Sequence, residues 1–135
     1  MGIPVSKIAV TGFLFLITLL SGVWLSRNLR LNDARAYGKP LTGTDSAVHK
    51  LIALATGIIA GVTIRSLHRG IEFSSIELAA VIVAGLLFAL MVVSGSLLSL
   101  GKARNKGMVA LHNVGSALTV VATAGAIYLL TRGGW

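Results

Sequence analysis

The chain has 135 residues, of which 55% are hydrophobic and 12% charged, and it contains no cysteine. This composition is typical of a chain that is nearly all membrane bundle, with no room for a separate soluble domain. The net charge of +8 does not indicate nucleic-acid binding, because the basic residues lie at the ends of apolar stretches rather than along one face. Without cysteine the chain is excluded from the membrane enzymes that handle disulfides through a dithiol relay.

Four uncharged stretches follow one another, at residues 8–26, 51–64, 78–101 and 107–131. A bilayer core of roughly 30 Å needs about 20 helical residues, so three of the stretches span it as they stand. The stretch 51–64 spans it if Ala47 to Leu67 form one helix whose Lys50 and Arg65 reach the two interfaces. The sequence therefore predicts one transmembrane domain, 1–135, with spans at about 6–26, 46–67, 76–100 and 107–131.

Basic residues are divided unevenly between the two sides of these spans. Eight lie in segments 27–50 and 102–106, and four lie on the other side, namely Lys7, Arg65, Arg69 and Arg132. Cytoplasmic loops carry an excess of Lys and Arg. The bias predicts a multi-pass protein of the cell (plasma or inner) membrane, with the first and third loops in the cytoplasm and both termini outside.

The second half of the chain resembles the first, which indicates either an internal duplication or chance identities between apolar helices drawn from the same few residue types. Segments 21–26 and 94–99 share the pattern S-G-x-x-L-S, and placing His49 on His112 aligns Thr56 with Thr119 without a gap. Both copies cross the membrane in the same sense, so an axis along the membrane normal is expected to relate them. We predict an all-α, integral membrane four-helix bundle built from two parallel-repeat helical hairpins, in which His49 and His112 face each other.

The two histidines are the candidate metal ligands. An ionisable ring inside a span is costly unless it is paired, lines a cavity or binds a metal. Neutral imidazole is the common axial ligand of haem iron, and facing helices of a bundle often build such sites. His49 and His112 thus indicate one haem b, and the alternative is a pair of interfacial residues near two helix starts.

Further residues near the histidines are candidates for contact with the cofactor. Small residues above each histidine leave room for a flat macrocycle or, alternatively, let two helices pack closely: Thr56, Gly57, Gly115 and Thr119. Cations near the same interface are candidates to pair with haem propionates: Arg27, Arg30, Lys50, Lys102 and Arg104.

The third histidine, His68, lies about 28 Å along the helix from His49 and cannot join the same site. It belongs to a charged group that either binds a quinone head group or an outside donor, or is simply solvated: Arg65, His68, Arg69, Glu72 and Glu77. None of the four acidic residues lies mid-span, which makes ion-coupled transport a less favoured function.

The pattern resembles the four-helix membrane b-type cytochromes, including the cytochrome b561-like group. The residues that carry the resemblance are Ser94-Gly95, the short basic loop after them, and Leu111-His112 with Gly115, together with the Ser21-Gly22 echo. The resemblance implies that His49 and His112 are axial ligands and that single electrons pass between a quinol, a soluble carrier or a partner subunit. Members with two haems need a second histidine pair, which this chain lacks, so at most one haem is expected.

Two other functions remain open from the sequence. The bundle is alternatively a membrane anchor subunit of a respiratory complex, or a cofactor-free structural or transport bundle. The expected surroundings are a lipid bilayer and either a quinone or a redox partner protein, with no nucleic acid. Whether the chain forms a homo- or hetero-oligomer is not decided by the sequence.

Overall fold

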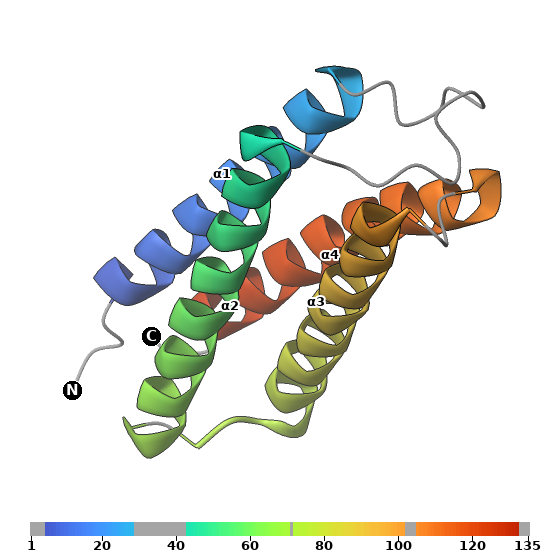
Figure 1. Ribbon diagram of the computed structural model, residues 1–135. Helices are drawn as coiled ribbons and strands as arrows, with labels where there is room; N and C mark the ends of the chain where they lie inside the picture. Colours follow the sequence, from blue (N-terminus) through green and yellow to red (C-terminus); the bar gives the residue numbers. More distant parts are fainter. Residues whose placement is uncertain (1–4, 29–42, 71, 102–104, 133–135) are drawn as a thin grey trace.

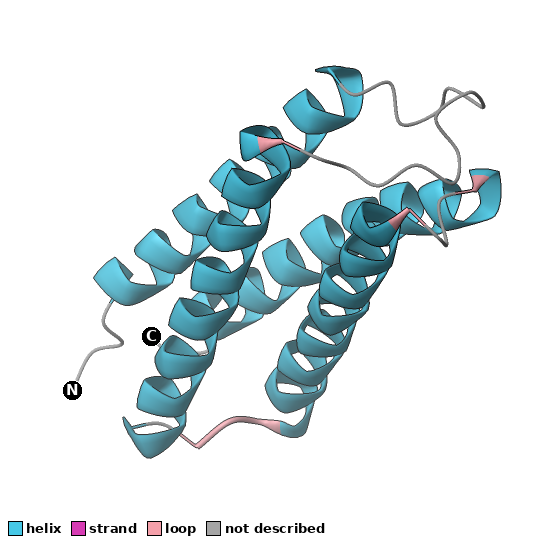
Figure 2. Ribbon diagram, viewed as in Figure 1, coloured by secondary structure: helices cyan, strands magenta, loops and turns pink. Residues whose placement is uncertain are grey.

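The computed structural model describes residues 5–28, 43–70, 72–101 and 105–132. Within these residues it contains four α-helices and no strand (Figures 1 and 2). They are α1 (Val5–Asn28), α2 (Thr44–Gly70), α3 (Ser75–Leu100) and α4 (Lys106–Arg132). Each helix is long and apolar enough to cross a membrane. The predicted all-α four-helix architecture is confirmed, and α2 is continuous through both Lys50 and Arg65.

Local chemistry sets the ends of α3. The Ser74 hydroxyl accepts a hydrogen bond from the Glu77 backbone N–H at 3.3 Å, and the Glu77 carboxylate accepts one from the Ser74 backbone N–H at 2.8 Å. This reciprocal pair satisfies two backbone donors that the first turn leaves free. At the other end, Gly101 has a φ of 79° and donates its N–H to the Leu98 carbonyl at 3.2 Å. Glycine adopts this left-handed conformation without steric cost.

The helices form two antiparallel hairpins. α1 packs along α2 and α3 packs along α4, and the hairpins meet through α1 with α4 and through α2 with α3 (Figure 1). α2 and α4 therefore occupy opposite corners of the bundle. α1 and α3 end, and α2 and α4 begin, at the same end, which we call the histidine end; the α2–α3 connection lies at the far end.

A contact between two equivalent residues marks the axis that relates the hairpins. In the register that aligns Ser21 with Ser94, Phe15 aligns with Phe88. The two rings pack edge to face, with centroids 5.3 Å apart and an interplanar angle of 72°. A residue meets its own equivalent only close to a two-fold axis. The axis therefore passes between these rings, as expected for two parallel repeats.

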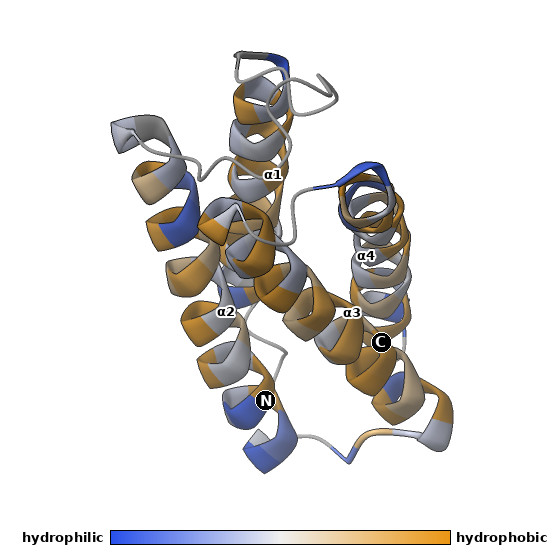
Figure 3. Ribbon diagram, turned by 45° about the vertical axis from the view of Figure 1, so that its right-hand side comes forward, coloured by the Kyte–Doolittle hydropathy of each residue, from blue (hydrophilic) through white to orange (hydrophobic). Residues whose placement is uncertain are grey.

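Burial is inverted relative to a water-soluble bundle. Large apolar side chains point outward, as with Leu86 at 67% exposure and Val121 at 70%, whereas Thr56 is fully buried and Ser94 is 2% exposed. Hydrophobic residues cover the helices along their length, and hydrophilic ones gather near the helix ends (Figure 3). This is the arrangement of helices that face lipid and associate through small and hydroxyl-bearing residues. The fold is that of a multi-pass membrane protein.

The contacts between the two helices of a hairpin differ from the first hairpin to the second. Between α1 and α2, hydroxyl groups pair across the interface, with Thr18 Oγ1 2.8 Å from Thr56 Oγ1 and Thr11 Oγ1 3.0 Å from Thr63 Oγ1. Between α3 and α4, the position aligned with Thr18 is Met91, and a Cβ added to Gly115 would lie 2.6 Å from its Sδ. At these aligned positions, a pair of hydroxyl groups joins α1 to α2, whereas close packing of Met91 on Gly115 joins α3 to α4.

Candidate cofactor site

Each candidate histidine is held by a serine of its own hairpin. His49 Nδ1, on α2, lies 2.8 Å from Ser21 Oγ on α1, and His112 Nδ1, on α4, lies 2.9 Å from Ser94 Oγ on α3. The partners are 28 residues apart in the first hairpin and 18 in the second, yet the geometry is the same. The different loop lengths do not affect it, because the antiparallel helices alone bring each pair to one level.

Each serine hydroxyl has two neighbours with which it can form a hydrogen bond, its histidine and a backbone carbonyl. A serine hydroxyl has one hydrogen to donate. Ser21 Oγ lies 2.8 Å from the Thr18 carbonyl oxygen, and Ser94 Oγ lies 3.2 Å from the Met91 carbonyl oxygen. When the hydroxyl donates to this carbonyl, its oxygen accepts from the Nδ1–H of the histidine; when it donates to Nδ1, the ring proton is on Nε2. In a neutral ring protonated at Nδ1, the Nε2 lone pair is the one left for a metal.

Glycine makes room for both rings. A Cβ added to Gly22 would lie 3.1 Å from Cε1 of His49, and one added to Gly95 would lie 3.1 Å from Cε1 of His112. Both distances are tighter than ordinary van der Waals contact. In each repeat the serine therefore forms a hydrogen bond with the histidine ring, and the glycine beside it leaves room for the ring. We call each of these arrangements, Ser21-Gly22 with His49 and Ser94-Gly95 with His112, a histidine seat.

The predicted small-residue contacts have partners within the protein. Thr56 is hydrogen-bonded to Thr18, and Thr119 donates to the Gly115 carbonyl at 2.7 Å. A Cβ on Gly57 would lie 2.8 Å from the Phe88 ring. These contacts place the four residues in helix packing, and their contact with a macrocycle stays a prediction.

The predicted propionate partners divide into two groups. Arg27 and Lys50 are exposed at the histidine end. Their long cationic side chains can reach an acidic group at the membrane interface. Arg30, Lys102 and Arg104 lie outside the described residues.

His68 lies at the far end of α2, away from the other two histidines. Its ring packs against Phe73, with centroids 5.6 Å apart, just before the start of α3. Across the described segments, no group of three or more His, Asp or Glu side chains is placed to hold a bare metal ion. A pair of imidazoles suits a metal that arrives in a macrocycle, because a porphyrin brings its own four nitrogens.

In the sequence Ser21 and Ser94 stand out only as marks of a repeat, and their role as histidine partners was not predicted. A signal was present: a serine near the end of one helix and a histidine near the start of the next, in both copies. In an antiparallel hairpin these positions lie at equal depth, so the recurrence of both residues together indicates contact.

The chain matches no protein-family model, no curated protein and no solved structure.

Proposed function

We propose that the protein is a membrane b-type cytochrome in which His49 and His112 hold one haem b. The observation that supports this most is the pair of equivalent serine contacts, which engage Nδ1 of both rings, so that Nε2 is the ring nitrogen that remains for a metal. Metal-ligating histidines almost always donate their other ring N–H to a fixed acceptor, which sets the tautomer and the ring orientation.

Within the protein, different residues would bind the haem iron, orient the histidine rings and pair with acidic groups of the cofactor. His49 and His112, on helices at opposite corners of the bundle, would hold the haem iron, and Ser21 and Ser94 would hold the two imidazole rings. Arg27 and Lys50 offer positive charge at the histidine end for acidic groups on the cofactor. Haem iron changes between its ferric and ferrous forms and so carries one electron at a time.

The proposed setting is the cell membrane, with the histidine end toward the cytoplasm and both termini outside. The support is the excess of basic residues in the two loops at the histidine end. Electrons would pass between a quinol, a soluble carrier or a partner subunit and this haem. A cytochrome that serves as the anchor of a respiratory complex uses the same site, and it would copurify with catalytic subunits.

The test is a dithionite-reduced minus oxidised absorption spectrum of the purified protein, expressed with added haem. We expect a sharp b-type α-band in the wild type and its loss in His49→Ala and in His112→Ala. The matched control is His68→Ala, which removes a histidine from the same helix as His49 but at the far end, and which should keep the band. A wild type without the band, or a band that survives both substitutions, refutes the proposal.

One observation favours a second candidate, a cofactor-free bundle. The Ser–His contacts lie within the hairpins, so they also join α1 to α2 and α3 to α4 without any ligand. In that case His49→Ala weakens the hairpin and no chromophore is ever found. The same spectra separate the two functions.

A further inference from the structure

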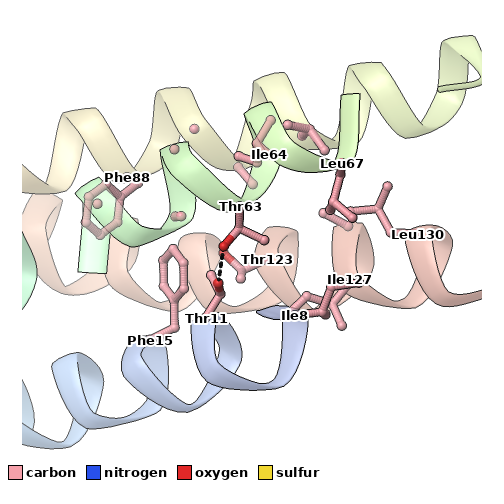
Figure 4. Close-up of a pocket in the computed structure, with 17 residues that line it drawn as sticks. Ile8, Thr11, Phe15, Thr63, Ile64, Leu67, Phe88, Thr123, Ile127 and Leu130 are labelled. Atoms are coloured by element: carbon pink, nitrogen blue, oxygen red, sulfur yellow. Dashed lines mark hydrogen bonds between the residues drawn. The ribbon is translucent and has the colours of Figure 1, made fainter. Parts of the chain in front are cut away.

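A cavity of about 270 Å³ lies between the two hairpins, in the half of the bundle toward the far end (Figure 4). Phe15 and Phe88 line its end nearer the middle of the bundle, and Leu67 and Leu130 line its other end. On α2 the lining residues run from Gly57 to Leu67, which is about 15 Å of helix length. The cavity is therefore long and narrow, and none of the residues that line it is charged.

The cavity opens toward the surrounding lipid between α2 and α3. Gly61 on α2 and Gly85 on α3 both line it, and both are exposed. A Cβ added at either glycine would meet nothing within 4 Å, so the space beside each of them is free of the described side chains. We call this pair of glycines the lateral opening. A hydrocarbon chain can pass here from the bilayer into the cavity without displacing a side chain.

The equivalent place between α4 and α1 is closed. Gly12 corresponds to Gly85 in the repeat, and a Cβ on Gly12 would contact Ile127 at 3.6 Å. Ala124 corresponds to Gly61 and carries a methyl group, and neither Gly12 nor Ala124 lines the cavity. The described helices therefore offer one such opening between the hairpins rather than two.

Two cations lie on the same face of α2 as the lateral opening. Arg65 and Arg69 follow Gly61 at intervals of four residues, so they lie on successive turns of one helix face toward the far end. Gly61 is about 14 Å from the end of α2 at Gly70, inside the span, whereas the two arginine side chains are exposed and long enough to reach the interface. The second repeat has Tyr128 where the first has Arg65, so the pair of arginines accompanies the open side only.

The acidic residues at this end leave an excess of positive charge. The Glu77 carboxylate is engaged in the cap of α3, where it accepts hydrogen bonds from the Ser74 backbone N–H at 2.8 Å and from the Ser74 hydroxyl at 2.9 Å. Lys7 donates to a neutral group, the Ser66 hydroxyl, at 2.8 Å. The far end has four basic residues, Lys7, Arg65, Arg69 and Arg132, against two acidic ones, Glu72 and Glu77.

From this combination we infer that the lateral opening binds one anionic phospholipid, with an acyl chain in the cavity and the phosphate on Arg65 and Arg69. A long apolar space fits a hydrocarbon chain, and a guanidinium group pairs with phosphate oxygens through two parallel hydrogen bonds. Basic pockets between membrane helices bind anionic headgroups in this way. A zwitterionic lipid offers the same chain but gains less from two arginines, because its headgroup also carries a cation. The inference does not depend on the haem, because none of its residues belongs to a histidine seat.

The test is native mass spectrometry of the full-length protein in detergent, titrated with phosphatidylglycerol or with phosphatidylcholine that has the same acyl chains. We expect the first phosphatidylglycerol to bind at least about fivefold more tightly than phosphatidylcholine, the equivalent of one cation near a membrane surface. Arg65→Gln combined with Arg69→Gln should weaken phosphatidylglycerol binding by at least about fivefold and change phosphatidylcholine binding less. Arg132→Gln is the matched control, because Arg132 is the counterpart of Arg69 on the closed side, and it should keep the preference.

A second pair of variants tests the cavity independently of charge. Gly85→Leu places a side chain in the lateral opening without displacing a neighbour, and it should weaken the binding of both lipids by at least about tenfold. Gly125→Leu also enters open space but away from the cavity, and it should leave binding within about twofold of the wild type. Circular dichroism checks that each variant keeps its helices.

Three results overturn the inference. The first is equal affinity of the wild type for the two lipids, which means that the headgroup is not recognised. The second is an equal loss of phosphatidylglycerol binding in Arg132→Gln and in the Arg65→Gln, Arg69→Gln variant, which means that any cation at this end attracts the lipid. The third is unchanged binding in Gly85→Leu, which means that the lipid lies on the outer surface of the bundle.

Discussion

Replacement of Ser94 by alanine tests the proposed role of the serines most directly. The change removes the oxygen that lies 2.9 Å from His112 Nδ1 and leaves the helix intact. One such hydrogen bond contributes about 1 kcal/mol net, or about fivefold in an equilibrium constant. The freed ring can also rotate or move its proton to Nε2, and loss of an outer-sphere partner in metal proteins costs about 10- to 100-fold in metal affinity. We therefore expect haem to bind between about fivefold and about a hundredfold more weakly.

The assay is the rate of haem transfer from the purified protein to apomyoglobin. Ser21→Ala should have a similar effect to Ser94→Ala, because the two seats have the same geometry. Ser96→Ala removes a hydroxyl from the same helix that donates only to the Val92 carbonyl, and it should behave as the wild type. Ser94→Thr, which keeps the hydroxyl, should recover much of the loss. If Ser94→Ala and Ser96→Ala release haem at the same rate, the reasoning from the serine contacts is refuted.

Three further predictions concern the bundle itself. Gly22→Ala adds a methyl group 3.1 Å from His49 Cε1, and we expect it to destabilise the first hairpin by about 1–3 kcal/mol in detergent unfolding; an unchanged midpoint would contradict the seat geometry. Thr18→Val and Thr56→Val, combined in a double-mutant cycle, should show a coupling of about 0.6 kcal/mol, and strictly additive effects would mean that their hydroxyls do not interact. Ser74→Ala should cost about 1 kcal/mol by removing the cap of α3, which the same unfolding assay would detect as a lower midpoint.

The sequence predicted the helices well because their cause is local. Long uncharged stretches must form helices in lipid, where every backbone group needs a partner within the segment. Even α2, whose uncharged part is short, follows from the reach of Lys50 and Arg65 to the interfaces. The repeat was also visible, since it depends only on residue identity and spacing.

The site was predicted only in part. The sequence supplied His49 and His112, but the serine contacts to their Nδ1 atoms require a known pairing of helices. The cavity between the hairpins, which Figure 4 shows, was out of reach for a similar reason, because its lining comes from all four helices.

The two ends of the bundle differ in how closely the repeats agree, and the demands on the two ends explain this difference. At the histidine end, both copies have the same serine, glycine and histidine in the same contacts. A metal that takes one nitrogen from each side imposes equal demands on both hairpins, so symmetry is useful there. Toward the far end, Thr11, Thr63 and Thr123 line the space between the hairpins where their counterparts are Ala84, Ala126 and Ala60. Side chains there have only to pack against one another or against lipid, so the two copies can differ without affecting the histidine end.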